Sequence, residues 1–120
     1  MRVAGFGFRK GASAAALADA LARAGGAAGV TALATAEDKA VGLQGIARTL
    51  GLPVIGVPKA ALAAQPVLTH SARVKALYGT GSLAEASALA AAGPGARLLG
   101  PRAQSQDGTA TAAIAERITP

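Results

Sequence analysis

Short apolar runs typical of β-strands alternate along this chain with alanine- and leucine-rich segments of helical spacing. Glycine and proline separate these segments, as at Gly25-Gly26, Gly51 and Gly93-Pro94-Gly95. Strands that alternate with helices at short intervals are typical of βα units, which build a parallel sheet through right-handed crossovers. The sequence therefore predicts an α/β fold, with a largely parallel or mixed sheet of about five strands flanked by helices.

The same glycine and proline residues set the boundaries of the expected strands and helices. Strands are expected at residues 2–6, 30–35, 53–57, 97–100 and 109–115. Helices are expected between Ser13 and Gly25 and at residues 43–50, 59–64, 71–78 and 83–92. Residues 7–11 are expected to form a turn, and residues 101–108 a polar loop that is either mobile or part of a ligand lid. We expect the last two strands to pair as a hairpin at one edge of the sheet.

The length of 120 residues predicts one domain over residues 1–120. Hydrophobic residues make up 52% of the chain, which is too many for a disordered chain. Charge-free windows fall short of the roughly 18 residues that a membrane span needs, and the first residues lack the apolar region of a signal peptide. We therefore expect a cytoplasmic protein that does not cross a membrane.

The chain is basic and has few residues of the types that usually act in catalysis. Twelve Lys and Arg residues against six Asp and Glu give a net charge of +6, and the chain has no Cys and one His. The lack of Cys excludes disulfides, Cys-ligated zinc and thiol nucleophiles, and we expect neither a metal nor a cofactor. A Ser71 nucleophile with His70 as base is disfavoured, because adjacent residues rarely face each other.

A glycine-rich segment at residues 5–11 is the first candidate site. It lies where a dinucleotide-binding fingerprint would lie, but its third glycine comes one residue late, which disfavours NAD binding. Two cations next to a helix start favour anions, since free backbone N–H groups point outward there. The candidate ligand-binding residues are Gly7, Arg9, Lys10, Gly11 and Ser13. The alternative is a tight turn between a strand and a helix, with no ligand.

Two further groups are candidate ligand-binding residues. Thr80, Gly81 and Ser82 precede a predicted helix and offer hydroxyl and N–H donors, although an N-cap explains them equally well. Lys39 follows the second predicted strand, and ligands of α/β sheets bind beyond the carboxyl ends of strands. Glu85 is expected to interact with the dipole of its helix. We predict that the two glycine-containing loops approach each other and share one crevice.

Several short motifs follow one another in a particular order. They are Gly5-x-Gly7-x-Arg9-Lys10-Gly11-x-Ser13, Leu33-Ala34-Thr35 with Lys39 and Gly42-Leu43, Leu50-Gly51-Leu52-Pro53, Gly79-Thr80-Gly81-Ser82-x-x-Glu85-Ala86-x-Ala88-Leu89, Leu98-Leu99 and Thr111-Ala112-Ala113-Ile114-Ala115. In this order they resemble the cobalamin-biosynthesis family CobE and, equally, the C-terminal domain of CbiG. The resemblance spans nearly the whole chain. Phe8 stands where many members carry Cys, so no thiol is available there.

The resemblance implies a role in cobalamin (vitamin B12) biosynthesis, with a corrin or precorrin intermediate as ligand and other enzymes of the pathway as further partners. Such tetrapyrroles carry many carboxylates, which a basic domain attracts. We expect a binding or accessory module. One alternative is a hydrolase of the cobalt-precorrin-5A type, as two-domain relatives imply. A nucleic-acid-binding module is disfavoured by scattered cations and few aromatics. The sequence does not decide whether the protein forms a homo-oligomer, and it identifies no catalytic residue.

Overall fold

The computed structural model describes residues 1–118 and shows one mixed α/β domain. Its elements, in chain order, are β1 (Arg2–Phe8), α1 (Ala14–Ala24), β2 (Val30–Ala36), the 3-10 helix η1 (Glu37–Leu43), α2 (Gln44–Leu50), β3 (Val54–Val57), α3 (Lys59–Ala63), α4 (Ala72–Tyr78), α5 (Leu83–Ala92), β4 (Arg97–Leu98), β5 (Ala103–Gln104) and β6 (Ala110–Glu116). The α/β class predicted from the sequence is confirmed.

The strands form a mixed sheet in the order β3-β2-β1-β6-β4, with β5 paired to β6, so the described part of the chain has six strands. The first three strands are parallel, while β6 runs antiparallel to β1, β4 and β5. The predicted pairing of the last strands is confirmed, but β6 lies inside the sheet between β1 and β4, so of these two strands only β4 is an edge strand. The short strand β5 lies within the expected polar loop.

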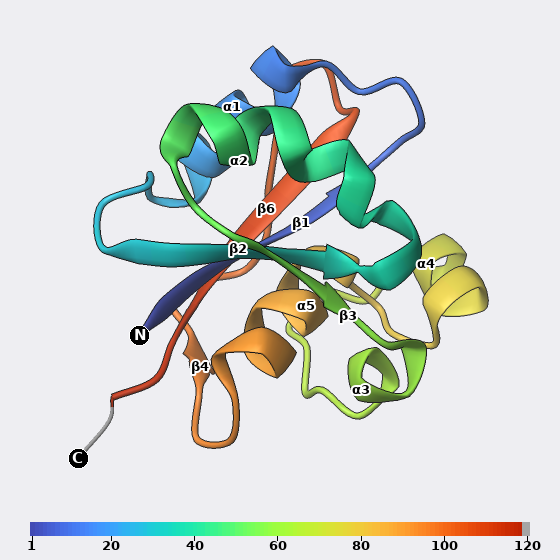
Figure 1. The fold of residues 1–120 in the computed structure, drawn as a ribbon. Coiled ribbons are helices and arrows are strands. Elements are labelled where there is room, and N and C mark those ends of the chain that lie inside the picture. Colours follow the sequence, from blue (N-terminus) through green and yellow to red (C-terminus); the bar gives the residue numbers. More distant parts are fainter. Residues whose placement is uncertain (119–120) are drawn as a thin grey trace.

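Helices cover both faces of the sheet (Figure 1). One apolar cluster joins α1 and α2 to the sheet through residues such as Phe6, Leu17 and Leu43, all at most 2% exposed. A second cluster joins α3 and α5 to the opposite face, with Leu62 and Leu83 among its members. With few aromatic residues, these layers are held by short-range packing of aliphatic side chains.

The close packing of α5 on β1 depends on glycine. A Cβ atom added at Gly5 would lie 2.0 Å from the carbonyl oxygen of Ala84, and one added at Gly7 would lie 2.8 Å from the Thr111 hydroxyl. Both glycines lie within β1, which continues to Phe8, so the prediction of a turn from Gly7 onward is wrong. The turn is shorter, and Gly11, with a φ of +85°, lies within it.

Helix α5 is buried on nearly all sides, which explains its alanine-rich sequence. Ala84, Ala86 and Ala88 are fully buried, and small side chains let the helix fit between the sheet and α3. The helix begins at Ser82, whose hydroxyl accepts a hydrogen bond from the Glu85 N–H at 3.2 Å. The start of α5 lies beside the carboxyl end of β1, since a Cβ at Gly7 would lie 3.5 Å from the Leu83 Cβ.

Candidate anion-binding site

A cavity of about 350 Å³ opens beyond the carboxyl end of β1. The parallel strands β1 and β2 have their carboxyl ends on the same side of the sheet, and the antiparallel β5–β6 hairpin reaches that side too. Ligands of α/β sheets bind beyond the carboxyl ends of the strands. The lining consists of Gly7, Phe8, Arg9, Lys10, Lys39, Ser71, Arg73, Val74, Leu77, Tyr78, Leu83, Arg102, Gln104, Gly108, Thr109 and Thr111.

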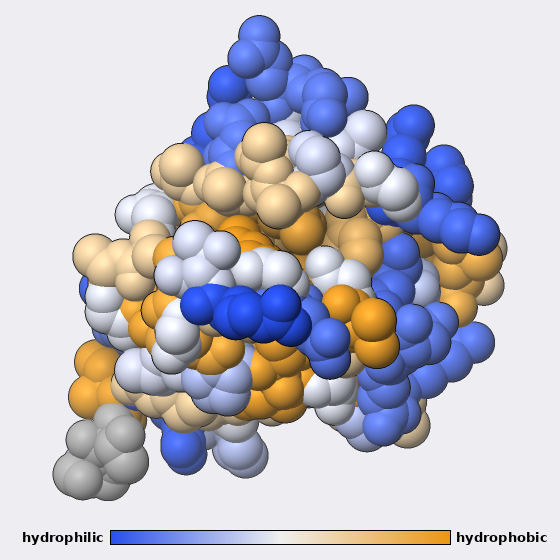
Figure 2. Space-filling model, turned by 45° about the horizontal axis from the view of Figure 1, so that its top comes forward, coloured by the Kyte–Doolittle hydropathy of each residue, from blue (hydrophilic) through white to orange (hydrophobic). Residues whose placement is uncertain are grey.

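The charge of this lining is entirely positive. Arg9, Lys10, Lys39, Arg73 and Arg102 line the cavity, and none of its lining residues is Asp or Glu. Hydrophilic side chains gather on the side of the molecule where Figure 1 places α4 and the β1–α1 loop, as Figure 2 shows. A concave site lined by positive charges focuses the electrostatic field and attracts anions.

Lys39 is the most constrained of these cations. Its ammonium donates a hydrogen bond to the Phe8 carbonyl oxygen and lies 4.5 Å from the centroid of the Phe8 ring. Burial lowers the pKa of Lys39 below its ordinary value of 10.5, and the charge of Arg73 acts in the same direction, against the carboxylate of Asp38. A bound anion would relieve this unfavourable environment.

Tyr78 brings a hydroxyl to the cavity from α4. Burial raises the pKa of Tyr78 above its ordinary value of 10.0, and the Asp38 carboxylate raises it further. The phenol therefore keeps its proton near neutral pH, and the neighbouring Asp38 carboxylate competes with a bound anion for this one donor.

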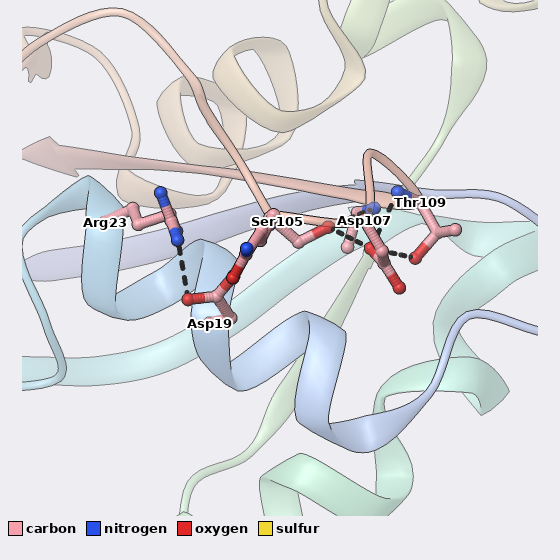
Figure 3. Close-up of polar contacts among 7 residues, drawn as sticks. Asp19, Arg23, Ser105, Asp107 and Thr109 are labelled. Atoms are coloured by element: carbon pink, nitrogen blue, oxygen red, sulfur yellow. Dashed lines mark hydrogen bonds and ion pairs between the residues drawn. The ribbon is translucent and has the colours of Figure 1, made fainter.

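The turn that follows β5 forms one wall of the cavity, and it is held by two carboxylates (Figure 3). Asp107 accepts hydrogen bonds from the Ser105 hydroxyl at 2.7 Å and from the Thr109 N–H and hydroxyl at 3.0 and 2.8 Å. Asp19 of α1 accepts one from the Gln106 N–H at 2.8 Å. The expected polar loop is thus a braced turn.

Glu85 belongs to the same region, and its role was not recognised from the sequence. Its fully buried carboxylate accepts hydrogen bonds from the N–H groups of Leu68 and Thr69 at 2.6 and 2.9 Å, from the Thr69 hydroxyl at 2.5 Å and from the Arg102 N–H at 2.8 Å. Burial alone would raise the pKa of Glu85, but these hydrogen bonds outweigh it, and the pKa lies below 4.5. The capping-box spacing of Ser82 and Glu85 would predict a hydrogen bond from the Ser82 N–H to the Glu85 carboxylate, but that N–H donates to the Thr80 hydroxyl instead, so this signal does not reveal the observed role.

The structure divides the predicted ligand-binding residues between several places. Gly7, Arg9, Lys10 and Lys39 line the cationic cavity. Gly11 and Ser13 do not, because Ser13 caps α1 through a hydrogen bond from the Ala16 N–H at 3.0 Å.

Thr80 and Gly81 line a second cavity of about 510 Å³ along the other side of α4, while Ser82 is buried as the α5 cap. The two glycine-containing segments do approach each other, since a Cβ at Gly7 would lie 3.5 Å from the Leu83 Cβ, but they line two cavities that share only Ser71 and not one crevice. A Cβ at Gly81 would lie 2.5 Å from the Thr69 carbonyl oxygen, so the protein's own backbone occupies the space beside this glycine.

Residues 1–118 contain neither a candidate membrane-spanning helix nor a candidate metal-ligand cluster. None of the helices there has the length and apolar character needed to cross a membrane. The same residues contain no group of three or more His, Cys, Asp or Glu side chains arranged to hold a metal ion.

Comparison with known proteins identifies the family. The family described as "Cobalamin synthesis G C-terminus" matches residues 2–115. The chain belongs to this family. No curated protein sequence matches the chain significantly.

Two crystal structures resemble the fold of this member of the cobalamin synthesis G C-terminus family. CobE, described as a protein from the cobalamin (vitamin B12) biosynthetic pathway, has 34% sequence identity and a TM-score of 0.84, over 99% of this chain and 95% of that one. The cobalamin biosynthesis protein chiG from Agrobacterium tumefaciens str. C58 has 38% identity and a TM-score of 0.72, over 99% of this chain and 100% of that one. The resemblance noted in the sequence is thereby confirmed.

Proposed function

We propose that this protein binds a polycarboxylate corrin precursor of cobalamin biosynthesis, with the carboxylates held in the cationic cavity. The observation that carries the proposal is the gathering of five Lys and Arg residues in the lining of one cavity that contains no acidic residue. Membership of a cobalamin-synthesis family supports a ligand from that pathway. The protein is then a binding or accessory module that retains an anionic intermediate.

The lining suits carboxylates attached to an apolar ring. Guanidinium groups such as those of Arg73 and Arg102 can bind a carboxylate through two parallel hydrogen bonds, and Lys39 adds a compact charge. Apolar side chains such as Leu77 and Leu83 line the same cavity and offer contacts to a ring edge. This combination distinguishes the site from one for a small inorganic anion.

The size of the cavity limits how much of such a ligand it encloses. Its volume of about 350 Å³ lies near the lower end of the range of roughly 300–1,000 Å³ for ligand pockets. A tetrapyrrole macrocycle with all its side chains is larger than this. The cavity therefore takes carboxylate side chains and one edge of the ring, and Leu77, 57% exposed, gives the rest of the ring an apolar surface.

Titration with uroporphyrin, a stable tetrapyrrole polycarboxylate, tests the proposal by absorbance or fluorescence. Replacing both Arg9 and Lys10 with Gln is expected to weaken binding by about 1–3 kcal/mol, the scale of hydrogen bonds to charged groups, with little change in Tm. The matched control replaces Arg48 and Lys59, which are exposed and lie outside the cavity. Equal losses in both double variants would mean that only net charge matters, and would refute a specific site.

Hydrolysis of a precursor is the second candidate function, and the environment of Lys39 is the observation that favours it. Burial lowers the pKa of Lys39 and so increases the share of its neutral amine, the form that can accept a proton from an attacking water. Incubation with cobalt-precorrin-5A, followed by mass spectrometry, tests this role. Turnover that is lost in Lys39→Gln would establish it, whereas unchanged substrate that stays bound would favour the binding module.

A further inference from the structure

No cation within residues 1–118 forms an ion pair with the buried carboxylate of Glu85. The two ion pairs within residues 1–118 are Arg2–Glu116 and Arg23–Asp19, and neither involves Glu85. Its carboxylate is satisfied instead by three backbone N–H groups and one hydroxyl. A buried charge is unfavourable unless such hydrogen bonds are well formed. The backbone positions of Leu68, Thr69 and Arg102 therefore depend on this one side chain.

One of the donors belongs to a residue of the cationic cavity. The Arg102 N–H lies 2.8 Å from a Glu85 carboxylate oxygen, and Arg102 is one of the residues that line the cavity. Arg102 lies between the two-residue strands β4 and β5, so regular strand pairing on either side of it is short. The hydrogen bond to Glu85 fixes the backbone from which this cation extends.

The other donors fix the segment that leads into α4. Leu68 and Thr69 both donate to Glu85, and two residues later Ser71 donates its N–H to the Gly81 carbonyl oxygen at 2.8 Å. Ser71 is also the N-cap of α4. Helix α4 contains no buried residue of its own, so its position depends on how its ends are anchored. This helix carries Arg73 and Tyr78 into the cavity.

We infer that Glu85 is a positioning residue of the anion site, whose carboxylate holds the two segments that present Arg102 and Arg73 to the ligand. The inference rests on the proposed function, since it concerns the same cavity. It assigns to a negatively charged side chain, outside the cavity lining, the task of assembling a positively charged site. Removal of the Glu85 charge should therefore weaken anion binding, whereas long-range electrostatics alone would strengthen it.

The test compares uroporphyrin binding by the parent protein, Glu85→Gln and Glu116→Gln. Both variants gain one unit of positive charge, so long-range attraction alone would strengthen anion binding in both. Glu116 pairs with Arg2 at the opposite end of β6 and serves as the matched control. We expect Glu85→Gln to bind about tenfold more weakly, on the scale of mutations that act through a coupled network, while Glu116→Gln binds at least as tightly as the parent.

A double-mutant cycle separates positioning from general loss of structure. Arg102→Gln is expected to weaken binding in the parent but to have little further effect in Glu85→Gln, because the guanidinium is already displaced there. Faster amide exchange at Leu68, Thr69 and Arg102 in Glu85→Gln would accompany the loss. Additive effects of the two substitutions, or binding by Glu85→Gln as tight as that of the parent, would overturn the inference.

Two further outcomes are covered by the same design. If Glu85→Gln does not fold, Thr69→Val takes its place, since it removes one hydrogen bond to the carboxylate and keeps the charge. Weaker binding by folded Thr69→Val supports the inference, and unchanged binding overturns it. Failure of the parent protein itself to bind uroporphyrin would refute the proposed function, and the inference with it.

Discussion

The ammonium of Lys39 lies 4.5 Å from the centroid of the Phe8 ring and donates a hydrogen bond to the carbonyl oxygen of the same residue. The contact joins η1, which follows β2, to the end of β1. The Phe8 ring also packs against Gly42, because a Cβ added at Gly42 would lie 2.6 Å from a ring carbon of Phe8. Phe8, Lys39 and Gly42 thus form one packed unit, of which Phe8 and Lys39 line the cationic cavity.

The environment of Lys39 predicts that anion binding weakens at alkaline pH. Its pKa is lowered by burial, so the lysine loses its proton at a lower pH than an exposed lysine. Carboxylates favour the protonated form, and affinity for uroporphyrin is therefore expected to fall as the pH rises through this lowered pKa. Binding isotherms from about pH 7 to 10 measure the effect.

Lys39→Gln provides the control for this pH dependence. The variant is expected to bind more weakly at neutral pH, since one cation is lost, but with a smaller decline toward alkaline pH. Tyr78 also titrates in the cavity, and its raised pKa places its ionisation at higher pH. An equal decline in the parent and in Lys39→Gln would assign the effect to another group.

Glu85 predicts a specific loss of stability in acid. Its pKa in the folded protein lies below the ordinary 4.5, so its contribution to the free energy of unfolding is fully present above pH 4.5 and is lost as the pH falls through the lowered pKa. Glu85→Gln is expected to be less stable than the parent at neutral pH. Because other carboxylates titrate identically in both proteins, the difference should shrink in acid, and urea unfolding at several pH values measures it. A difference that is independent of pH would contradict this prediction.

A pair of glycine substitutions tests the close packing of α5 on the sheet. Gly5→Ala places a methyl group 2.0 Å from the Ala84 carbonyl oxygen and is expected to destabilise the fold by about 1–3 kcal/mol or more, because backbone must move. Gly45→Ala is the control, since nothing lies within 4 Å of its Cβ position in α2, and it should stabilise by roughly 0.5–1 kcal/mol. Equal effects in thermal unfolding would show that the packing at Gly5 relaxes easily.

The fold was largely predictable, because local signals and the tertiary structure agree. Ser13 and Ser82 were candidate ligand-binding residues, but both cap helices, which is the alternative that local sequence also offered, and glycines end these helices. The errors came from effects between distant segments. Gly7 looks like a turn residue by itself, yet it lies in β1 because Thr111 and α5 pack against it. The placement of β6 beside β1 depends on pairing over more than 100 residues, which no local pattern records.

The site was only partly predictable for the same reason. Arg9, Lys10 and Lys39 could be chosen because they follow predicted strands. Arg73 and Arg102 reach the cavity only through the path of the chain around α4 and through the braced loops, so their positions could not be read from spacing. The Thr80-Gly81 motif has the composition of an anion cradle, but residues 69–70 pack against it.

The last prediction concerns the turn that forms one wall of the cavity, and it uses two residues of α1. Asp19 pairs with Arg23 at 3.0 Å and also accepts a hydrogen bond from the Gln106 N–H (Figure 3). Asp19→Ala and Arg23→Ala both remove the exposed ion pair, which contributes little to stability. Only Asp19→Ala leaves the Gln106 N–H without its acceptor, so only this variant should exchange that amide faster.

The same pair of variants links the turn to binding. Gln104 and Thr109 flank the turn and line the cavity, so loosening it should weaken uroporphyrin binding in Asp19→Ala and leave Arg23→Ala close to the parent. Net charge predicts the reverse order, since Asp19→Ala becomes more positive and Arg23→Ala less so. Titrations at two salt concentrations distinguish the explanations, because screening reduces a charge effect far more than a geometric one. Tighter binding by Asp19→Ala at low salt only would show that the brace has no part in the site.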